Sequence, residues 1–262
     1  MKTPQFKQIS KRMAGVNDEE WSARVDLAAA YRLTYKMGWS DLISIHISHR
    51  VPGYPGQFLV NPHGEMFDEI TASSLIKTDM EGNTLSESPY PINPAVLVIH
   101  AGILEARPDV NCVMHLHSQY GTAVSMQEHG LLPASQHALM IWNKLCYHDF
   151  EGPAIDDNEK ISLARNLGDK KCMILRNHGT LTCGSTMGET FMNMYQLERA
   201  CKMQITAMVG GSPLQPISKE IIERSIMQAD NIFGKKGFVP EGKREWSALL
   251  RQLDRECPDY KS

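Results

Sequence analysis

The stretch that most constrains this chain is a short apolar segment with two histidines, Cys112-Val-Met-His-Leu-His-Ser118. Its apolar residues predict a buried strand, on which side chains alternate between the two faces of a sheet. His115 and His117 therefore point the same way, roughly 7 Å apart along the chain. Two imidazoles at that spacing can converge on one Zn²⁺ ion, whose catalytic sites combine three protein ligands with an open position. The alternative is that one histidine packs in the core while the other is solvated at the strand end.

A second apolar segment, Met173-Ile-Leu-Arg-Asn-His-Gly-Thr180, offers the missing third ligand. It predicts a strand that ends in a polar corner, where His178 precedes Gly179. A histidine at a strand end beside a glycine turn is well placed to complete a three-histidine metal site. A capped turn with no ligand role is the alternative interpretation.

Five short motifs lie between residues 46 and 179 of the chain, within a resemblance that covers roughly residues 20–255. They are His115-Leu-His117, Arg176-Asn-His-Gly179, Glu105-Ala-Arg-Pro-Asp109, His46-Ile-Ser48 and Asn61-Pro-His-Gly64. Together they resemble the class II aldolase/adducin family, and the two histidine motifs, in this order and at this separation, are the most specific part of the resemblance. The resemblance implies a three-layer α/β/α sandwich around a mostly antiparallel central sheet.

The resemblance also implies how the site is composed. A divalent metal, zinc or alternatively manganese, is held by the residues that match the family's ligands, His115, His117 and His178. The resemblance further implies a homotetramer with sites between its subunits, and a small-molecule substrate. Around the metal we expect His46 and Tyr120 as catalytic proton donors, with Ser48, His63, Gly64 and Tyr260 as substrate contacts.

The family's catalytic acid is absent from this chain. In the aldolases of the family, a glutamate on the helix before the histidine strand acts as the base, and Val96 stands at its position. The phosphate-binding positions also differ, because Ile45-His46 and Pro94-Ala95 replace small residues that donate hydrogen bonds. We therefore predict a metal-dependent carbon–carbon lyase, of aldolase or decarboxylase type, that acts on a small non-phosphorylated keto or hydroxy acid. The alternative is a non-catalytic adducin-like interaction protein that keeps the fold and the metal site.

Length and charge favour a single enzyme-like domain. The 262 residues contain no linker-like stretch, so we expect one domain over residues 17–262, preceded by a polar N-terminal arm over residues 1–16. The formal net charge of −3 and the pI near 6.4 leave no excess of basic residues. Nucleic acid and anionic membranes are therefore poor candidates as partners.

The cysteines and the N-terminus bear on the cellular compartment. Six cysteines are scattered without a Cys-x-x-Cys pair, and several lie in apolar segments, as is typical of reduced thiols in a cytoplasmic protein. Residues 1–10 carry lysines but lack the apolar core of a signal peptide. No apolar run approaches the length of about 18 residues that a membrane span requires. We therefore expect a cytoplasmic protein.

Hydrophobic periodicity predicts the elements around these motifs. Residues 42–50 alternate as a strand whose polar face carries His46 and Ser48, and this face borders either a polar cavity or solvent. Residues 187–209 form the longest predicted helix, with a methionine-rich apolar stripe expected in the core or in a subunit contact. His100, on the apolar face of the helix before the histidine strand, is expected to be a core histidine rather than a ligand.

Overall fold

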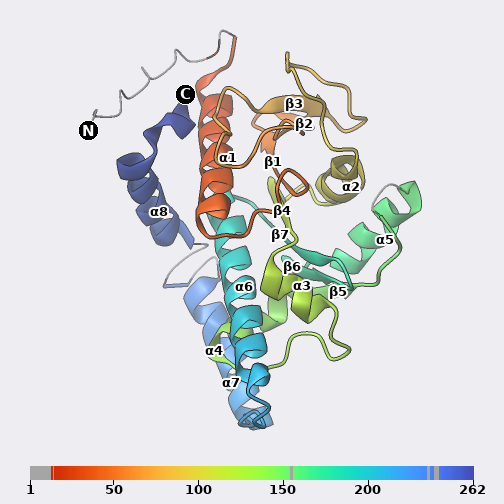
Figure 1. Cartoon of the computed structure of the whole chain (residues 1–262), viewed down its shortest axis with the longest axis vertical. Helices are drawn as coiled ribbons and strands as arrows, with labels where there is room; N and C mark the ends of the chain where they lie inside the picture. The colour runs from red at the N-terminus through yellow and green to blue at the C-terminus, as the bar shows by residue number, and fades with distance from the viewer. Residues whose placement is uncertain (1–12, 14, 154–155, 235–236, 239–241) are drawn as a thin grey trace.

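A mainly antiparallel sheet runs through the structure (Figure 1). This computed structural model describes residues 13, 15–153, 156–234, 237–238 and 242–262. Within these residues the sheet has seven strands in the order β3-β2-β1-β4-β7-β6-β5. The strands are β1 (His46–Val51), β2 (Tyr54–Val60), β3 (Ile76–Asp79), β4 (Cys112–Leu116), β5 (Leu145–His148), β6 (Cys172–Leu175) and β7 (Gly179–Gly184). All neighbouring strands are antiparallel except β5 and β6, which confirms the predicted central sheet.

Helices cover both faces of the sheet, which gives the predicted α/β/α sandwich (Figure 1). They are α1 (Asp18–Lys36), η1 (Leu97–Ala101), α2 (Gly102–Ala106), α3 (Gln119–Ser125), α4 (Gln136–Ile141), η2 (Trp142–Lys144), α5 (Asp157–Leu167), α6 (Met187–Val209), α7 (Lys219–Phe233), α8 (Lys243–Glu256) and η4 (Pro258–Lys261). On one face α1, α6 and α8 bury apolar side chains against β1 and β4. On the other face η1, α2 and α5 pack against β2, β6 and β7.

The predicted helix over residues 187–209 is confirmed as α6, with the same ends. Thr186 caps its start by accepting a hydrogen bond from the backbone N–H of Glu189 (3.1 Å). Met194 and Cys201 on the predicted stripe are fully buried in the core, whereas Met208 near the end of the helix is exposed. No helix in the described part of the chain is both long and apolar enough to cross a membrane.

Two further expectations concern the reduced state of the cysteines and the N-terminal arm. All six cysteines are free thiols in the structure. The expected arm over residues 1–16 lies almost wholly outside the described residues. The boundaries of the single domain, residues 17–262, therefore stay a prediction.

The strand predicted over residues 42–50 begins later than expected. Leu42 is exposed and has a left-handed φ of 48°, which a strand cannot contain. The N–H of Ser44 donates to the carbonyl of Asp41 (2.9 Å) and closes a turn. The segment before His46 is therefore a turn, although its residue types still alternate as they would in a strand.

The helix that precedes β4 begins with a π-helical turn, η1, and continues as α2. Its start is capped by Asn93, whose Oδ1 accepts a hydrogen bond from the N–H of Ala95 (3.0 Å). His100 lies in η1 and is fully buried against the sheet, so the expected core histidine is confirmed. Turns of π-helix are frequent at functional sites, because the extra residue per turn alters how side chains are presented.

The hydroxyl of Tyr31 joins helix α1 to strands β1 and β2. It donates to Oδ1 of Asn61 (2.7 Å) and accepts from the backbone N–H groups of Ile47 (2.7 Å) and Asn61 (3.3 Å). Tyr31 is fully buried, so water cannot take over these bonds. Because Ile47 lies between His46 and Ser48, this hydroxyl holds in place the strand segment that carries both polar side chains.

We predict that Tyr31→Phe lowers the free energy of unfolding by about 2–3 kcal/mol, because buried N–H groups of Ile47 and Asn61 lose their acceptor. The matched control is Tyr35→Phe on the same helix, where the side chain is 46% exposed. The control should change the free energy of unfolding by less than about 0.5 kcal/mol. Urea denaturation followed by circular dichroism measures both variants. Equal losses in the two would contradict the role given to the Tyr31 hydroxyl.

Candidate active site

Three histidine side chains converge at one end of the sheet. His115 belongs to β4, His117 follows that strand, and His178 lies in the turn before β7. The Nε2 atoms of His115 and His117 are 3.0 Å apart, and those of His117 and His178 are also 3.0 Å apart. A ligand atom from each of the three lies within 4.8 Å of the others, and the described residues contain no second cluster of this kind.

The turn that carries His178 depends on the residues on either side of it. Asn177 has a left-handed φ of 56°, which asparagine tolerates better than most residues. Gly179 lies directly against β4, where a Cβ would overlap the carbonyl oxygen of Leu116. The antiparallel pairing of β7 with β4 then brings His178 beside His117.

Hydrogen bonds on the far side of the rings determine which nitrogens are unprotonated. Nδ1 of His115 faces the carbonyl oxygen of Thr180 (3.1 Å), and Nδ1 of His117 faces Oδ2 of Asp41 (3.1 Å). Both oxygens are acceptors, so each Nδ1 donates its proton to one of them, and in the neutral form of each ring Nε2 presents a lone pair. Two lone pairs 3.0 Å apart repel one another, and a shared cation relieves this repulsion. Tetrahedral Zn²⁺ with bonds of 2.0–2.1 Å needs nitrogens about 3.3 Å apart. Nε2 of His117 lies 3.0 Å from Nε2 of each of the other two rings, which is close to this spacing.

Burial and mutual proximity keep the rings of His115 and His178 neutral. Burial, and then the nearby His178 and His46, lower the pKa of His115 well below its usual value. Burial, followed by His117 and His148, lowers the pKa of His178 to about 4. The neutral imidazole is the form that binds a metal, so His115 and His178 need not lose a proton to do so near neutral pH.

A second group of buried polar side chains adjoins the three histidines. Nδ1 of His46 lies 2.7 Å from Nε2 of His100, and Nδ1 of His100 lies 2.6 Å from the hydroxyl of Ser48. The pairing of β1 with β4 sets His46 opposite His115, with 5.2 Å between the ring centroids. His46 is 1% exposed and Ser48 is 0% exposed, so the solvent-facing alternative for this strand face is wrong. Burial, and then His100, lower the pKa of His46 well below its usual value.

His63 and Gly64, expected as substrate contacts, lie in the turn after β2. Nδ1 of His63 is buried and has no hydrogen-bond partner among the described residues. Its ring is close enough to His46 to contribute to the lowered pKa of that residue. Gly64 is covered by Tyr90, whose ring would overlap a Cβ at this position. His63 is therefore near His46, whereas Gly64 is packed under an aromatic ring.

Tyr120 and Tyr260 contact other groups. Tyr120 on α3 lines a cavity of about 290 Å³ together with Arg199 and Lys202, and the Nζ of Lys202 lies 5.4 Å from its ring centroid. Tyr260 is fully buried in the core of its own chain, and its hydroxyl donates to Oδ1 of Asp254 (2.9 Å). The structure therefore does not bring Tyr260 to the histidines of its own chain, because the C-terminal turn packs the ring against α1.

Sequence patterns do not reveal two acidic residues of the site. Asp41 orients the ring of His117 from the turn before β1, where nothing in the local sequence distinguishes it. Glu198 is a buried carboxyl on the apolar side of α6, and this mismatch with its surroundings is the signal that could have found it. It accepts hydrogen bonds from the hydroxyl of Ser118 and the N–H of Gly121, and so holds the start of α3 next to His117.

Burial raises the pKa of Glu198 from 4.5 to about 7, although hydrogen bonds from Ser118 and Gly121 act to lower it. Between these two values the folded protein keeps a proton that the unfolded chain releases. The free energy of unfolding therefore falls as the pH rises through this window, and Glu198 adds no further change above it. The decline corresponds to about 3 kcal/mol.

Sequence comparison relates this chain to bacterial and animal proteins. The family model described as "Class II Aldolase and Adducin N-terminal domain" matches residues 25–205. A Pseudomonas aeruginosa protein named "Putative aldolase class 2 protein" is 48% identical over 248 residues, which are 95% of each chain. Alpha-adducin of Rattus norvegicus is 38% identical over 241 residues, which are 88% of this chain and 33% of the adducin.

Solved structures share the fold over nearly the whole chain. An aldolase II superfamily protein from Pseudomonas syringae superposes with a TM-score of 0.89 and 43% identity, covering 95% of this chain and 98% of that one. L-fuculose 1-phosphate aldolase from Glaciozyma antarctica gives a TM-score of 0.79 at 25% identity, covering 94% and 96%. The similarity of fold therefore extends beyond residues 25–205 into the C-terminal helices.

We predict that Glu198→Gln removes the decline in stability between about pH 5 and about pH 7.5, because the amide does not ionise there. Urea denaturation at both pH values measures the difference between wild type and variant. Glu223→Gln, at an exposed position on α7, is the matched control and should keep the wild-type difference. An unchanged pH dependence in Glu198→Gln would show that this carboxyl does not carry the buried proton.

Proposed function

This chain belongs to the class II aldolase and adducin family, and on that premise we propose that it is a metal-dependent carbon–carbon lyase. Membership of the family supports lyase-type activity. The observation that carries the proposal is the set of three histidine ligand atoms that face one another beside the buried ring of His46. We propose a decarboxylase or retro-aldol type of reaction on a small, non-phosphorylated keto or hydroxy acid.

The three histidines offer the nitrogen donors that suit Zn²⁺, and Mn²⁺ is the alternative metal. When bound, a divalent metal supplies Lewis-acid polarisation of a substrate oxygen. Thr180 and Asp41 hold the rings of His115 and His117 through their Nδ1 atoms, so that both Nε2 atoms stay directed at one point. Outer hydrogen bonds of this kind fix the tautomer of a ligating histidine and raise its basicity.

Val96 argues against a reaction that begins by removing a proton from carbon. Its side chain is fully buried among apolar neighbours and cannot accept a proton. Decarboxylation has no such requirement: the bond to the carboxylate carbon breaks, its electron pair stays on the neighbouring carbon, and carbon dioxide leaves. A proton must then be added to that carbon. We assign this step to His46, which engages His100 through Nδ1 and has Nε2 left for the substrate.

The bonds from Ser48 through His100 to His46 suit this role. In one tautomer the hydroxyl of Ser48 donates to Nδ1 of His100, and Nε2–H of His100 donates to Nδ1 of His46. Nε2 of His46 then carries the proton to be donated. As it leaves, Nδ1 of His46 takes the proton from Nε2 of His100, Nδ1 of His100 takes the hydroxyl proton of Ser48, and a proton from solvent restores that hydroxyl. Both rings are neutral in this arrangement, as their lowered pKa values require, since burial is the main cause of both shifts. Ser48 and His100 thus act as positioning residues for His46.

The altered phosphate-binding positions support a substrate without phosphate. Ile45 is fully buried in the apolar core, and Pro94 has no N–H to donate. Of the expected substrate contacts Ser48, His63 and Gly64, Ser48 is bonded to His100 and Gly64 lies under the ring of Tyr90. Among them His63 has a buried Nδ1 without a partner in the described part of the chain, which makes it the most direct candidate for a hydrogen bond to a carboxylate or hydroxyl.

We predict that the purified protein binds about one divalent metal per chain and that His115→Ala/His117→Ala loses it, because one histidine alone cannot hold the ion. Elemental analysis by plasma mass spectrometry gives the ratio of metal to protein. His129→Ala, in the loop after α3, is the matched control and should keep the metal. Full occupancy in the double variant would exclude these histidines as ligands.

The substrate proposal is tested with metal-loaded protein on a ketose 1-phosphate and on a panel of small keto and hydroxyaromatic acids. We expect release of carbon dioxide or carbon–carbon cleavage with at least one acid, and little or none with the sugar phosphate. His46→Asn should lower kcat about 10²–10⁴-fold, as loss of a general acid does, whereas His129→Asn should not. Robust cleavage of the sugar phosphate by the wild type would contradict the substrate class, because another group must then replace the acid missing at Val96.

An adducin-like interaction protein without turnover is the second candidate function. It is favoured by Val96 at the position of the family's acid and by the similarity to rat alpha-adducin, of which the matched region spans 33%. One measurement, turnover of the metal-loaded protein on the substrate panel, distinguishes the two candidate functions. A protein with its metal bound and no turnover on the whole panel would favour the interaction protein.

We further propose a homotetramer in the cytoplasm, with sites between subunits as the family resemblance implies. Met126, Val209 and Met227 are all more than half exposed and offer apolar surface for subunit contact. The free cysteines suit a reducing compartment. Both proposals are independent of the identity of the substrate.

A further inference from the structure

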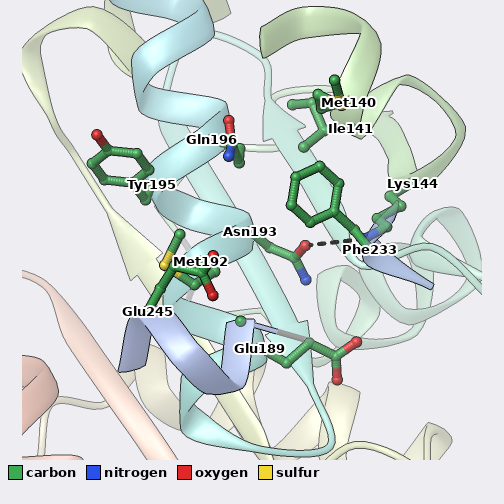
Figure 2. A pocket seen from close by; sticks show the side chains of 11 residues that line it. Met140, Ile141, Lys144, Glu189, Met192, Asn193, Tyr195, Gln196, Phe233 and Glu245 are labelled. Carbon is green, nitrogen blue, oxygen red and sulfur yellow. Dashed lines mark hydrogen bonds between the residues drawn. The ribbon is translucent and has the colours of Figure 1, made fainter. Parts of the chain in front are cut away.

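A cavity of about 230 Å³ lies between α6, the α4–η2 segment and the adjoining ends of α7 and α8 (Figure 2). At one end it is lined by Glu189, which accepts a hydrogen bond from the N–H of Ser185 just after β7 ends. His178 precedes the other end of the same strand. This end of the cavity is therefore separated from the three histidines by the length of β7, and the proposed lyase reaction makes no use of it.

Three buried polar atoms in the lining have no hydrogen-bond partner among the described residues: Nδ2 of Asn193, Oε1 of Gln196 and Oε2 of Glu245. Asn193 is only 5% exposed. Its Oδ1 accepts from Nζ of Lys144 (3.5 Å), so the other end of the amide, Nδ2, is the unpaired donor (Figure 2). Buried polar groups in folded proteins are nearly always paired, so unpaired atoms that share one cavity indicate a missing ligand.

The charges around the cavity are also incompletely balanced. Burial acts to raise the pKa of Glu189, but hydrogen bonds from Lys171 and Ser185 lower it overall, so this carboxylate is already paired. Glu245 forms no ion pair with any described residue, and neither does Lys144. The cavity thus presents one carboxylate and one ammonium group, each without a counter-charge, and Figure 2 shows them on either side of Asn193.

We propose that this cavity binds a small zwitterion with an apolar body, namely an apolar α-amino acid. The ligand ammonium is held by the acceptors Glu245 and Gln196, and the ligand carboxylate is held by Lys144 and Nδ2 of Asn193. Its side chain packs against Phe233 and the methionines of the lining. The volume restricts the ligand to this size, because sites for drug-sized molecules measure about 300–1,000 Å³.

The test is isothermal titration calorimetry of the wild-type protein with L-leucine, with 4-methylpentanoate, which lacks the ammonium group, and with 3-methylbutylamine, which lacks the carboxylate. Leucine should bind with a stoichiometry of one per chain. Each partial analogue should bind with a Kd at least about tenfold higher than that of leucine. Absence of binding by L-leucine, L-methionine and L-isoleucine at millimolar concentration would overturn the proposal. Equal affinity for leucine and its partial analogues would do the same.

Variants locate the ligand. Glu245→Gln and Asn193→Asp should each weaken leucine about tenfold or more, because the first removes the counter-charge of the ammonium and the second sets an anion against the carboxylate. Glu220→Gln, at an exposed position on α7, is the matched control. Glu245 is only half-buried, so the Glu245→Gln protein should melt near the wild-type temperature. This variant therefore still tests the proposal if Asn193→Asp fails to fold.

An amino acid can also chelate a metal, so the histidine site needs its own comparison. Binding that survives in His115→Ala/His117→Ala and is lost in Glu245→Gln supports the proposal. Binding that is lost in the histidine variant and unchanged in Glu245→Gln would place leucine on the metal and overturn it. The outcome does not depend on whether lyase activity is found.

Discussion

The pairing of β4 with β1 on one side and with β7 on the other is the constraint on which the site depends. This register sets His46 opposite His115 and lets His178, just before β7, reach His117. Strand pairing is fixed by backbone hydrogen bonds and by the burial of alternate side chains on each face. A slip of β1 by one residue would turn His46 into the apolar layer that now holds Ile47, and the four rings would no longer meet.

The elements of the fold that could be predicted from sequence are those in which the hydrophobic periodicity and the capping or turn residues indicate the same structure. Helix α6 has a capping threonine, a long apolar stripe and a glycine after its end, and its predicted limits are the observed ones. The shared direction of His115 and His117 follows from the alternation of a strand alone. The start of β1 could not be predicted in this way, because the left-handed Leu42 interrupts an alternation that the residue types still display.

Contacts between distant segments could not be predicted. Asp41 and His117 are 76 positions apart, and Glu198 is 80 positions from Ser118, so no local pattern encodes either pair. The burial of Tyr260 has the same origin, since only tertiary packing decides whether a C-terminal aromatic ring enters its own core. Asp41 holds the ring of His117 and Glu198 holds the start of α3 beside it, and the spacing of residues along the chain predicts neither contact.

Gly179 links the geometry of the site to the integrity of the sheet. Because it lacks a side chain, the turn of His178 lies directly on the carbonyl of Leu116, and the ligand nitrogens of His117 and His178 come within 3.0 Å of each other. A ligand held jointly by His117 and His178 therefore binds the paired strands better than the separated ones. By thermodynamic linkage it must strengthen their pairing by the same factor. Occupancy of the site would then be measurable far from it, as slower exchange of the amide hydrogens along β7.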